Sequence, residues 1–186
     1  MGGLDDAARD FVAIFERLGI EYAIMGGLAV RLYALPRPTF DVDFTAAVAR
    51  DRLPEVFQAA EEVGFTIPAS TTTGWLDTIH GLPVIKFQWL QNSHSIDIDV
   101  FLVETAFQRE VLARKQRHGA DGWDAWFVSA EDLVLLKLLA NRPKDRTDVL
   151  DILFIHGQVD EEYLRTWAKA LGVADALEAA LHQPRE

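Results

Sequence analysis

The chain of 186 residues is 49% hydrophobic, which suits one folded domain, or one domain with a helical annex, and excludes wholesale disorder. Its formal net charge of −11 at pH 7 argues against a general nucleic-acid binder, because such proteins gain most of their affinity from basic surface. The absence of cysteine excludes disulfides and thiolate metal sites, and the absence of a long apolar run or a signal-peptide pattern predicts a cytoplasmic protein without a membrane span.

Helical and strand patterns alternate over the first half of the chain. Apolar residues recur at helical spacing before Gly19, whose type predicts a helix stop. Farther on, Phe40, Val42 and Phe44 alternate with two aspartates, which predicts a half-buried strand with an acidic face. The expected elements are helices over residues 5–18, 28–35 and 53–63, strands over residues 20–25 and 40–44, and a turn near residues 71–74.

The second half of the chain begins with a strand pair and continues mainly as helices. From Thr105 onward the pattern is helical, apart from a short strand at Phe127 and Val128. Ser129 and Asp132 form a capping pair before a leucine-rich helix. The expected elements are a hairpin of strands over residues 84–90 and 95–103 across residues 91–94, and helices after residue 129 and over residues 147–155, 160–171 and 174–181.

These patterns predict an α/β (α+β) fold with a mixed sheet flanked by helices. The expected strands define a core over residues 1–104, and a mainly helical region over residues 105–186 is expected to pack on it. Tryptophan is frequent, and Trp75 and Trp89 are candidates to line a pocket for a base, although packing is the ordinary role of this residue type.

A glycine pair, Gly26-Gly27, stands where the first strand gives way to a helix. Glycine lets a backbone approach an anion closely, and the start of a helix presents free N–H groups and the positive end of its dipole. The pair therefore favours binding of a triphosphate. The alternative is that the glycines only turn the chain.

Paired aspartates recur on two expected strands. Asp41 and Asp43 alternate along the first of these strands, and Asp97 and Asp99 alternate along the second, so the carboxylates of each pair share one face. Neighbouring carboxylates repel one another unless a cation neutralises them, and hard divalent cations such as Mg²⁺ prefer oxygen ligands. The pattern indicates metal-dependent phosphoryl or nucleotidyl transfer, and its alternative is a set of solvent-facing aspartates on a one-sided sheet.

These motifs together resemble the DNA polymerase β nucleotidyltransferase superfamily, in which Gly-Gly and a short helix precede Thr-x-Asp-x-Asp and a later strand aspartate. Residues 129–149, with Lys137, Asp145 and Asp148 at matching distances, resemble the branch that contains the AbiEii-type abortive-infection toxins. The similarity covers roughly residues 20–155. It implies a nucleotidyltransferase fold with a C-terminal helical region.

The resemblance also implies metal ligands. Asp41 and Asp43 would bind two Mg²⁺ ions, for which Mn²⁺ is an alternative. Asp99 would be the third carboxylate and would accept the proton of the attacking hydroxyl, with Asp97 as the alternate.

A second implied group binds the nucleotide. Gly26, Gly27 and Thr39 would hold the triphosphate, and Lys137 would reach its phosphates from the helical region. Arg37 would assist, although Pro38 separates it from the threonine that arginine directly precedes in many family members.

Asp145 and Asp148 would orient Lys137 and the incoming substrate. The alternatives from residue type alone are a lysine that extends its amine to solvent and two carboxylates that stabilise a helix start.

The implied reaction moves a nucleoside monophosphate from an NTP to an acceptor hydroxyl. The acceptor is an RNA such as a tRNA 3′ end, or a protein, in a toxin with a cognate antitoxin. A small-molecule acceptor is the alternative, because the Gly-Gly opening also resembles aminoglycoside and lincosamide nucleotidyltransferases. A non-catalytic module that binds a nucleotide or an antitoxin is a further alternative.

Overall fold

The structure is a computed structural model that describes residues 3–69, 77–79, 81–91, 94–120 and 123–183. The turn expected near residues 71–74 and the base-pocket candidate Trp75 lie outside these residues. The helices are α1 (Leu4–Leu18), α2 (Gly26–Tyr33), α3 (Leu53–Glu62), α5 (Ala106–Ala113), α6 (Ala130–Ala140), α7 (Pro143–Ile155), α8 (Glu161–Leu171) and α9 (Ala174–Leu181). The strands are β1 (Tyr22–Met25), β2 (Asp41–Ala46), β3 (Phe65–Thr66), β4 (Asp77–Ile79), β5 (Leu82–Gln91), β6 (His94–Leu102), β7 (Gln116–Ala120) and β8 (Trp123–Phe127).

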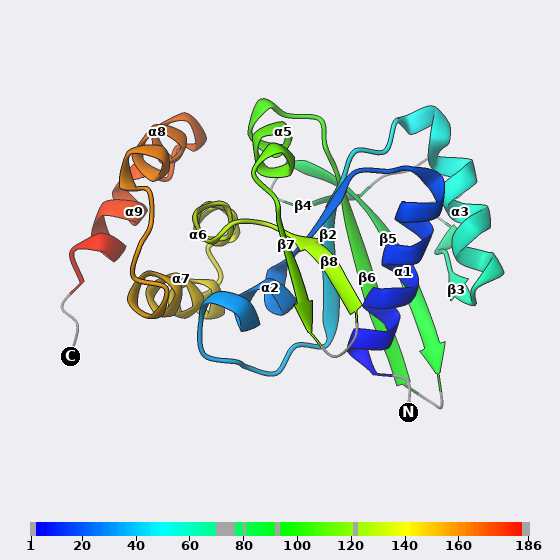
Figure 1. The fold of residues 1–186 in the computed structure, drawn as a ribbon. Coiled ribbons are helices and arrows are strands. Elements are labelled where there is room, and N and C mark those ends of the chain that lie inside the picture. Colours follow the sequence, from blue (N-terminus) through cyan, green and yellow to red (C-terminus); the bar gives the residue numbers. More distant parts are fainter. Residues whose placement is uncertain (1–2, 70–76, 80, 92–93, 121–122, 184–186) are drawn as a thin grey trace.

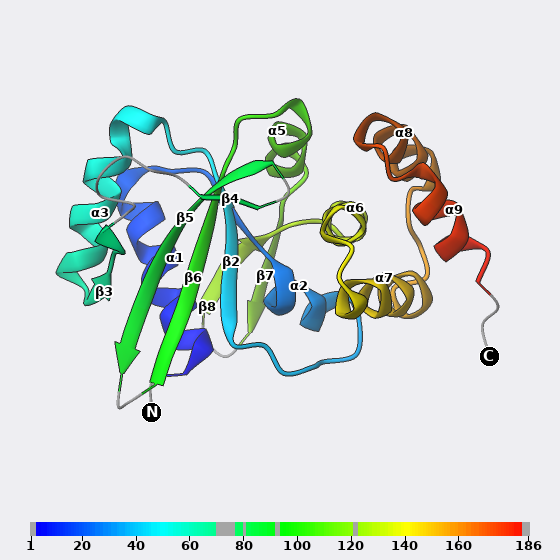
Figure 2. The same ribbon diagram turned by 180° about the vertical axis from the view of Figure 1, so that it is seen from behind.

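The strands form one mixed sheet in the order β3-β5-β6-β2-β1-β8-β7, with β4 paired to β5. At its centre β2 runs parallel to β6 and antiparallel to β1, and β1 runs parallel to β8. Helices α1 and α3 cover one face, while α2 lies on the other face and separates the sheet from the helical region α6–α9 (Figure 1, Figure 2). This arrangement confirms the expected fold class.

An aromatic cluster fills the space between the sheet and α1. The Phe11 ring is fully buried and lies 4.9 to 5.5 Å, centroid to centroid, from four other phenylalanine rings. Val42 and Phe44 point into this core, so the intervening aspartates of β2 point to the opposite face, toward α2 and the helical region. Phe40, expected to share the buried face, is instead 82% exposed because it precedes the first residue of β2.

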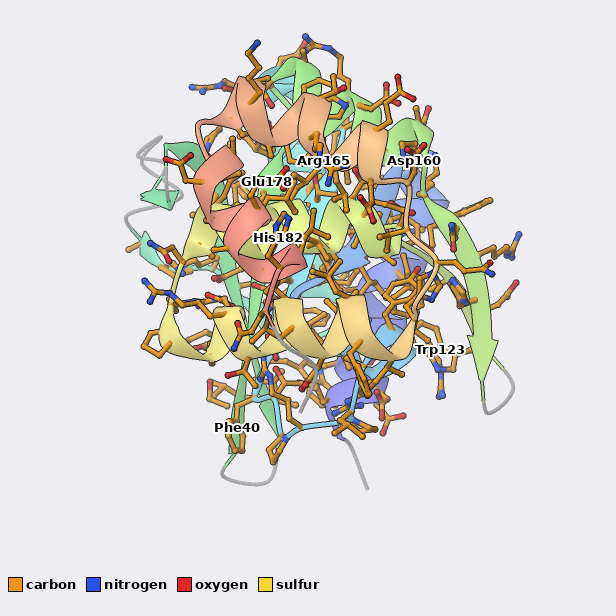
Figure 3. The ribbon with its side chains drawn as sticks, turned by 90° about the vertical axis from the view of Figure 1, so that its left-hand side faces the viewer. Phe40, Trp123, Asp160, Arg165, Glu178 and His182 are labelled. Atoms are coloured by element: carbon orange, nitrogen blue, oxygen red, sulfur yellow. The ribbon has the colours of Figure 1, made fainter. Side chains whose placement is uncertain are left out.

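The helical region packs as two layers beyond α2. Helices α6 and α7 contact α2, and α8 and α9 lie outside them. An ion pair of 2.8 Å between Arg165 of α8 and Glu178 of α9 joins the outer pair, as Figure 3 shows from that side. None of the helices in the described part of the chain is both long and apolar enough to cross a membrane.

One expectation for the second half was wrong. Residues after Thr105 were expected to be helical up to Phe127, but after the short helix α5 the chain forms the hairpin of β7 and β8, which extends the sheet beyond residue 104. The sequence of β7 lacks apolar alternation because β7 is the last strand of the sheet and carries polar residues such as Arg117 and His118. The division into a core over residues 1–104 and a region over residues 105–186 stays a prediction.

Two helix starts also differ from expectation. Helix α2 begins at Gly26 itself, so the glycine pair forms its first turn. Helix α7 begins at Pro143 rather than near Thr147, because proline fits the first helical position, where its missing N–H is not needed.

The aromatic cluster gives a stability prediction. We expect Phe11→Ala to lower the free energy of unfolding by about 3–5 kcal/mol, the range for deleting a buried phenylalanine ring. Phe40→Ala removes the same atoms from an exposed position and is expected to change the free energy of unfolding by less than about 0.5 kcal/mol. Urea unfolding of both variants measures the difference, and equal effects would contradict the assigned core.

Candidate active site

The aspartates of two neighbouring strands lie in register on one face of the sheet. In the parallel pair of β2 and β6, Asp41 lies beside Asp97 and Asp43 beside Asp99. Asp41, Asp43 and Asp99 line a cavity of about 100 Å³ that leucines of α6, Lys137 and Arg142 close from the helical side. Asp97 does not line it. The structure thus brings together three of the four predicted carboxylates and the predicted lysine.

The glycine pair makes room for the acidic strand. Gly26 has a φ of +64°, and a Cβ on it would lie 1.8 Å from Oδ2 of Asp43. A Cβ on Gly27 would lie 2.3 Å from the hydroxyl oxygen of Thr39. Only glycine therefore lets the start of α2 lie this close to β2.

Thr39 connects this contact to the first aspartate. Its hydroxyl donates a 2.7 Å hydrogen bond to Oδ1 of Asp41, which fixes the direction of that carboxylate. Gly27, Thr39 and Asp41 are therefore mutually dependent in position, which explains why these residue types occur together.

The carboxylates repel one another in the cavity. Burial raises the pKa of Asp43 from 3.8 to about 7, and the negative charges of Asp41 and Asp99 add to this shift. The positive charges of Lys137 and Arg142 oppose it without cancelling it. A site in which like charges are held together against their repulsion is suited to a bound cation.

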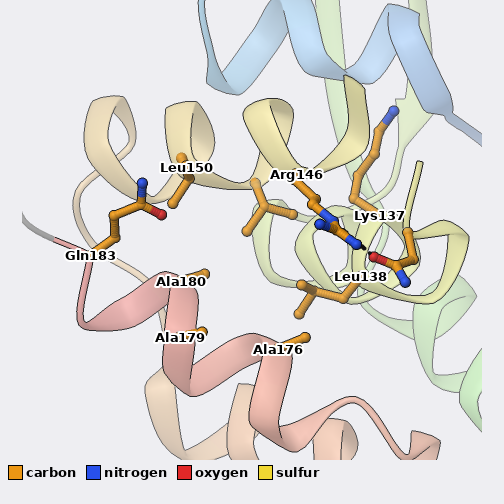
Figure 4. A pocket seen from close by; sticks show the side chains of 10 residues that line it. Lys137, Leu138, Arg146, Leu150, Ala176, Ala179, Ala180 and Gln183 are labelled. Carbon is orange, nitrogen blue, oxygen red and sulfur yellow. Dashed lines mark hydrogen bonds between the residues drawn. The ribbon is translucent and has the colours of Figure 1, made fainter. Parts of the chain in front are cut away.

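Lys137 lies in a buried network of charges. Its ammonium is 3.0 Å from Oδ1 of Asp145 and 2.8 Å from Oδ2 of Asp148, and its side chain is 4% exposed. The alternative of a lysine extending its amine to solvent is therefore wrong. Figure 4 shows a second cavity, of about 340 Å³, lined by Lys137 and by alanines of α9, and the end of the Lys137 side chain points away from those alanines.

Two arginines complete the network from outside. Arg37 donates to both carboxylate oxygens of Asp148 at 2.7 and 2.8 Å, and Arg142 donates to both oxygens of Asp145 at 2.6 and 3.2 Å. Burial disfavours ionisation of the two aspartates, but hydrogen bonds from these arginines and from Lys137 outweigh it and lower the pKa of both carboxyls. Both carboxylates are thus held ionised around Lys137.

Asp99 and Asp97 have different partners. Both oxygens of Asp99 accept hydrogen bonds from Lys86 of β5, at 3.1 and 3.0 Å. Burial raises the pKa of Asp99, and the bonds from Lys86 partly offset that rise. Asp97 is exposed and accepts a 3.1 Å hydrogen bond from Gln88. The geometry favours Asp99 over Asp97 as the third carboxylate of the cavity.

Sequence reasoning missed one residue of the site and misplaced another. Lys86 received no role, although the expected hairpin across residues 91–94 places it directly opposite Asp99. Trp89 is not part of a base pocket, because its side chain is buried on the other face of β5 and packs near Phe65. Its position in the strand shares the parity of the core residues Ile85 and Phe87, so the pattern already indicated this.

Metal binding rests on the chemistry of these donors. Within the described ranges, no group of three or more His, Asp or Glu side chains converges as a preformed ion site. Asp41, Asp43 and Asp99 nevertheless supply only oxygen donors, from one cavity, and their mutual repulsion would be relieved by a divalent ion. These residues fit Mg²⁺ or Mn²⁺.

The sequence matches one protein family over almost its full length. Residues 4–180 fit the family model described as "Nucleotidyltransferase of unknown function (DUF6036)". No curated protein matches the chain. The match names no toxin branch, so the resemblance to AbiEii-type proteins stays a prediction.

Solved structures with the same fold include two antibiotic-modifying enzymes. The structure of ANT(2″)-Ia in complex with adenylyl-2″-tobramycin matches with a TM-score of 0.57 and 14% identity, over 89% of this chain and 95% of that one. The lincosamide antibiotic adenylyltransferase LnuA with bound lincomycin matches with a TM-score of 0.54 and 14% identity, over 83% of this chain and 99% of that one. A putative nucleotidyltransferase from Thermotoga maritima, TM1012, matches with a TM-score of 0.50 and 13% identity, over 90% of this chain and 95% of that one. At these identities the likeness shows the fold alone.

The raised pKa of Asp43 predicts how stability depends on pH in metal-free buffer. The folded protein holds this proton up to a pH of about 7, whereas the unfolded chain releases it near pH 3.8. We therefore expect the free energy of unfolding to decrease between about pH 4 and pH 7, by up to about 4 kcal/mol, since one pKa unit corresponds to about 1.4 kcal/mol. Urea unfolding in EDTA at several pH values measures this.

Asp43→Asn is the control, because the amide does not titrate. The difference in stability between the variant and the wild type should change with pH over this interval and be constant above it. A difference independent of pH would show that neither burial nor the neighbouring carboxylates raise the pKa of Asp43.

Proposed function

The chain belongs to the nucleotidyltransferase family described as DUF6036, and on that premise we propose that it moves a nucleoside monophosphate from an NTP to an acceptor hydroxyl. In this reaction the acceptor oxygen attacks the α-phosphorus, the bond to the β-phosphate breaks, and pyrophosphate leaves while the hydroxyl proton passes to a base. The observation that carries the proposal is the cavity in which three carboxylates face Lys137 and Arg142. Phosphoryl transfer depends on positioning and charge neutralisation, which this arrangement provides.

The carboxylates would hold the metal. Asp41 and Asp43 are the proposed ligands, with Asp99 as the third, and Mg²⁺ bound there would neutralise phosphate charge and activate the attacking hydroxyl. Thr39 keeps Asp41 in one orientation, and the close approach of Gly26 keeps Asp43 in place. With its pKa raised by burial, Asp99 is suited to accept the proton of the hydroxyl.

The charged network around Lys137 would bind the phosphates of the nucleotide. Lys137, Arg37 and Arg142 carry three positive charges against the two negative charges of Asp145 and Asp148, which leaves one net positive charge. Because the aspartates hold Lys137 from two sides, its ammonium is positioned before a nucleotide arrives. We assign Asp145 and Asp148 this positioning role.

The start of α2 would bind the triphosphate. Gly26 and Gly27 form the first turn of this helix, directly beside the carboxylates of β2. The free N–H groups of a first turn bind phosphate oxygens well.

We infer a small molecule as the acceptor, because two proteins that share this fold are named for antibiotic substrates. ANT(2″)-Ia and LnuA match this chain over 95% and 99% of their own length. A net charge of −11 also suits a cationic acceptor such as an aminoglycoside better than a polyanion. The resemblance over residues 129–149 supports the other class, an RNA, tRNA or protein acceptor in a toxin with a cognate antitoxin.

Nucleotide binding is the first test of the proposal. We expect calorimetry to detect binding of at least one NTP in the presence of Mg²⁺, and expect Asp41→Ala/Asp43→Ala to abolish it because the metal loses its ligands. Transfer of label from an α-labelled NTP is then tested with tobramycin, lincomycin, tRNA and casein as acceptors. Binding without transfer to any acceptor would favour a non-catalytic nucleotide-binding module, and the absence of all binding would contradict the proposal.

The two aspartates of β6 allow a matched comparison. We expect Asp99→Asn to reduce the rate of transfer by at least about 100-fold, because it removes a base and a metal ligand from the cavity. Asp97→Asn changes the same group on the same strand outside the cavity, and a change of less than about threefold is expected. Rates under saturating NTP and metal measure both, and the reverse order would identify Asp97 as the third carboxylate.

A further inference from the structure

Lys86 is a cation built into the acidic face of the sheet. It lies directly opposite Asp99 in the antiparallel pair of β5 and β6, on the face that carries the catalytic carboxylates. Cross-strand neighbours of opposite charge attract one another, so the register of the hairpin alone brings the two together. Lys86 contributes the only cation placed on this face by the described strands of the sheet centre, β1, β2, β5 and β6.

The ammonium of Lys86 donates hydrogen bonds to both carboxylate oxygens of Asp99. The ammonium is 3.1 Å from Oδ1 and 3.0 Å from Oδ2, so both oxygens that would bind a metal already have a cationic partner. The Asp99 side chain is 16% exposed, whereas that of Lys86 is 40% exposed. The lysine therefore can move into solvent, while the aspartate stays in the cavity.

We propose that Lys86 is an exchangeable counter-ion of Asp99, which a divalent metal ion displaces when it binds to the carboxylates. This inference rests on the proposed function. Before the metal binds, Lys86 orients the buried carboxylate and favours its ionised form. When the metal binds, the ammonium loses its partner and turns toward solvent.

Removal of Lys86 should strengthen metal binding. Because the metal no longer competes with the ammonium, we expect Lys86→Met to bind Mn²⁺ about three- to fivefold more tightly than the wild type, the range expected for loss of a partly exposed ion pair. Lys86→Arg restores the competing charge and should bind Mn²⁺ with affinity close to that of the wild type. Electron paramagnetic resonance measures free Mn²⁺ and needs no turnover.

Lys115→Met is the matched control. Lys115, which precedes β7, pairs at 2.9 Å with Glu21, which precedes β1 and is not one of the cavity carboxylates. Its removal should leave Mn²⁺ affinity unchanged. Equal affinities of Lys86→Met and the wild type would overturn the inference without touching the proposed function. Absence of Mn²⁺ binding by all four proteins, with or without NTP, would overturn both.

Labelling of the wild type gives a second readout that no folding defect can affect. An amine-reactive reagent with mass spectrometry should modify Lys86 at least about twofold faster after addition of Mn²⁺, because displacement exposes its ammonium. The rate for Lys115 should stay constant. A rate for Lys86 that does not rise when Mn²⁺ is bound would contradict displacement.

Discussion

The placement of Lys137 between Asp145 and Asp148 is the interaction on which the site depends. A charged lysine whose side chain is 4% exposed is stable only if carboxylates surround its ammonium, and removing one of them would leave an uncompensated buried charge. The two aspartates come from α7 and the lysine from α6, so the ion pairs fix the two helices relative to each other. Arg37 then ties this unit to the loop before β2. The helical region thus holds a defined position opposite the acidic strands.

On the sheet side, a steric constraint determines the position of the carboxylates. The two glycines of α2 leave no room for a Cβ, since Asp43 and Thr39 occupy that space. The close approach of α2 that excludes a side chain at these two positions also brings the start of the helix beside Asp43 of β2. Packing and function therefore share these residues, and a Gly-Gly pair before Thr-x-Asp-x-Asp is understandable from geometry alone, before any nucleotide is considered.

The sequence predicted those parts of the structure that short-range periodicity determines. Strands with alternating aspartates and helices with capping residues were placed within a few residues, because each pattern is local. The strand β7 was missed because an edge strand with polar residues on both faces has no alternation to detect. The partner of Asp99 was missed for another reason: Lys86 acquires its role only from the register across the hairpin, which depends on two segments together.

Charge balance links these features. Asp41, Asp43 and Asp99 place three carboxylates in one cavity of a protein whose net charge is already −11. Lys86 compensates Asp99 from the sheet, and the network around Lys137 contributes its single excess charge from the helices. Asp41 and Asp43 have no direct cationic partner among the described residues. In line with this, burial and the negative charges of Asp41 and Asp99 raise the pKa of Asp43. A fold that pairs Asp99 with a cation but gives no direct cationic partner to Asp41 and Asp43 is organised to receive positive charge beside these two aspartates.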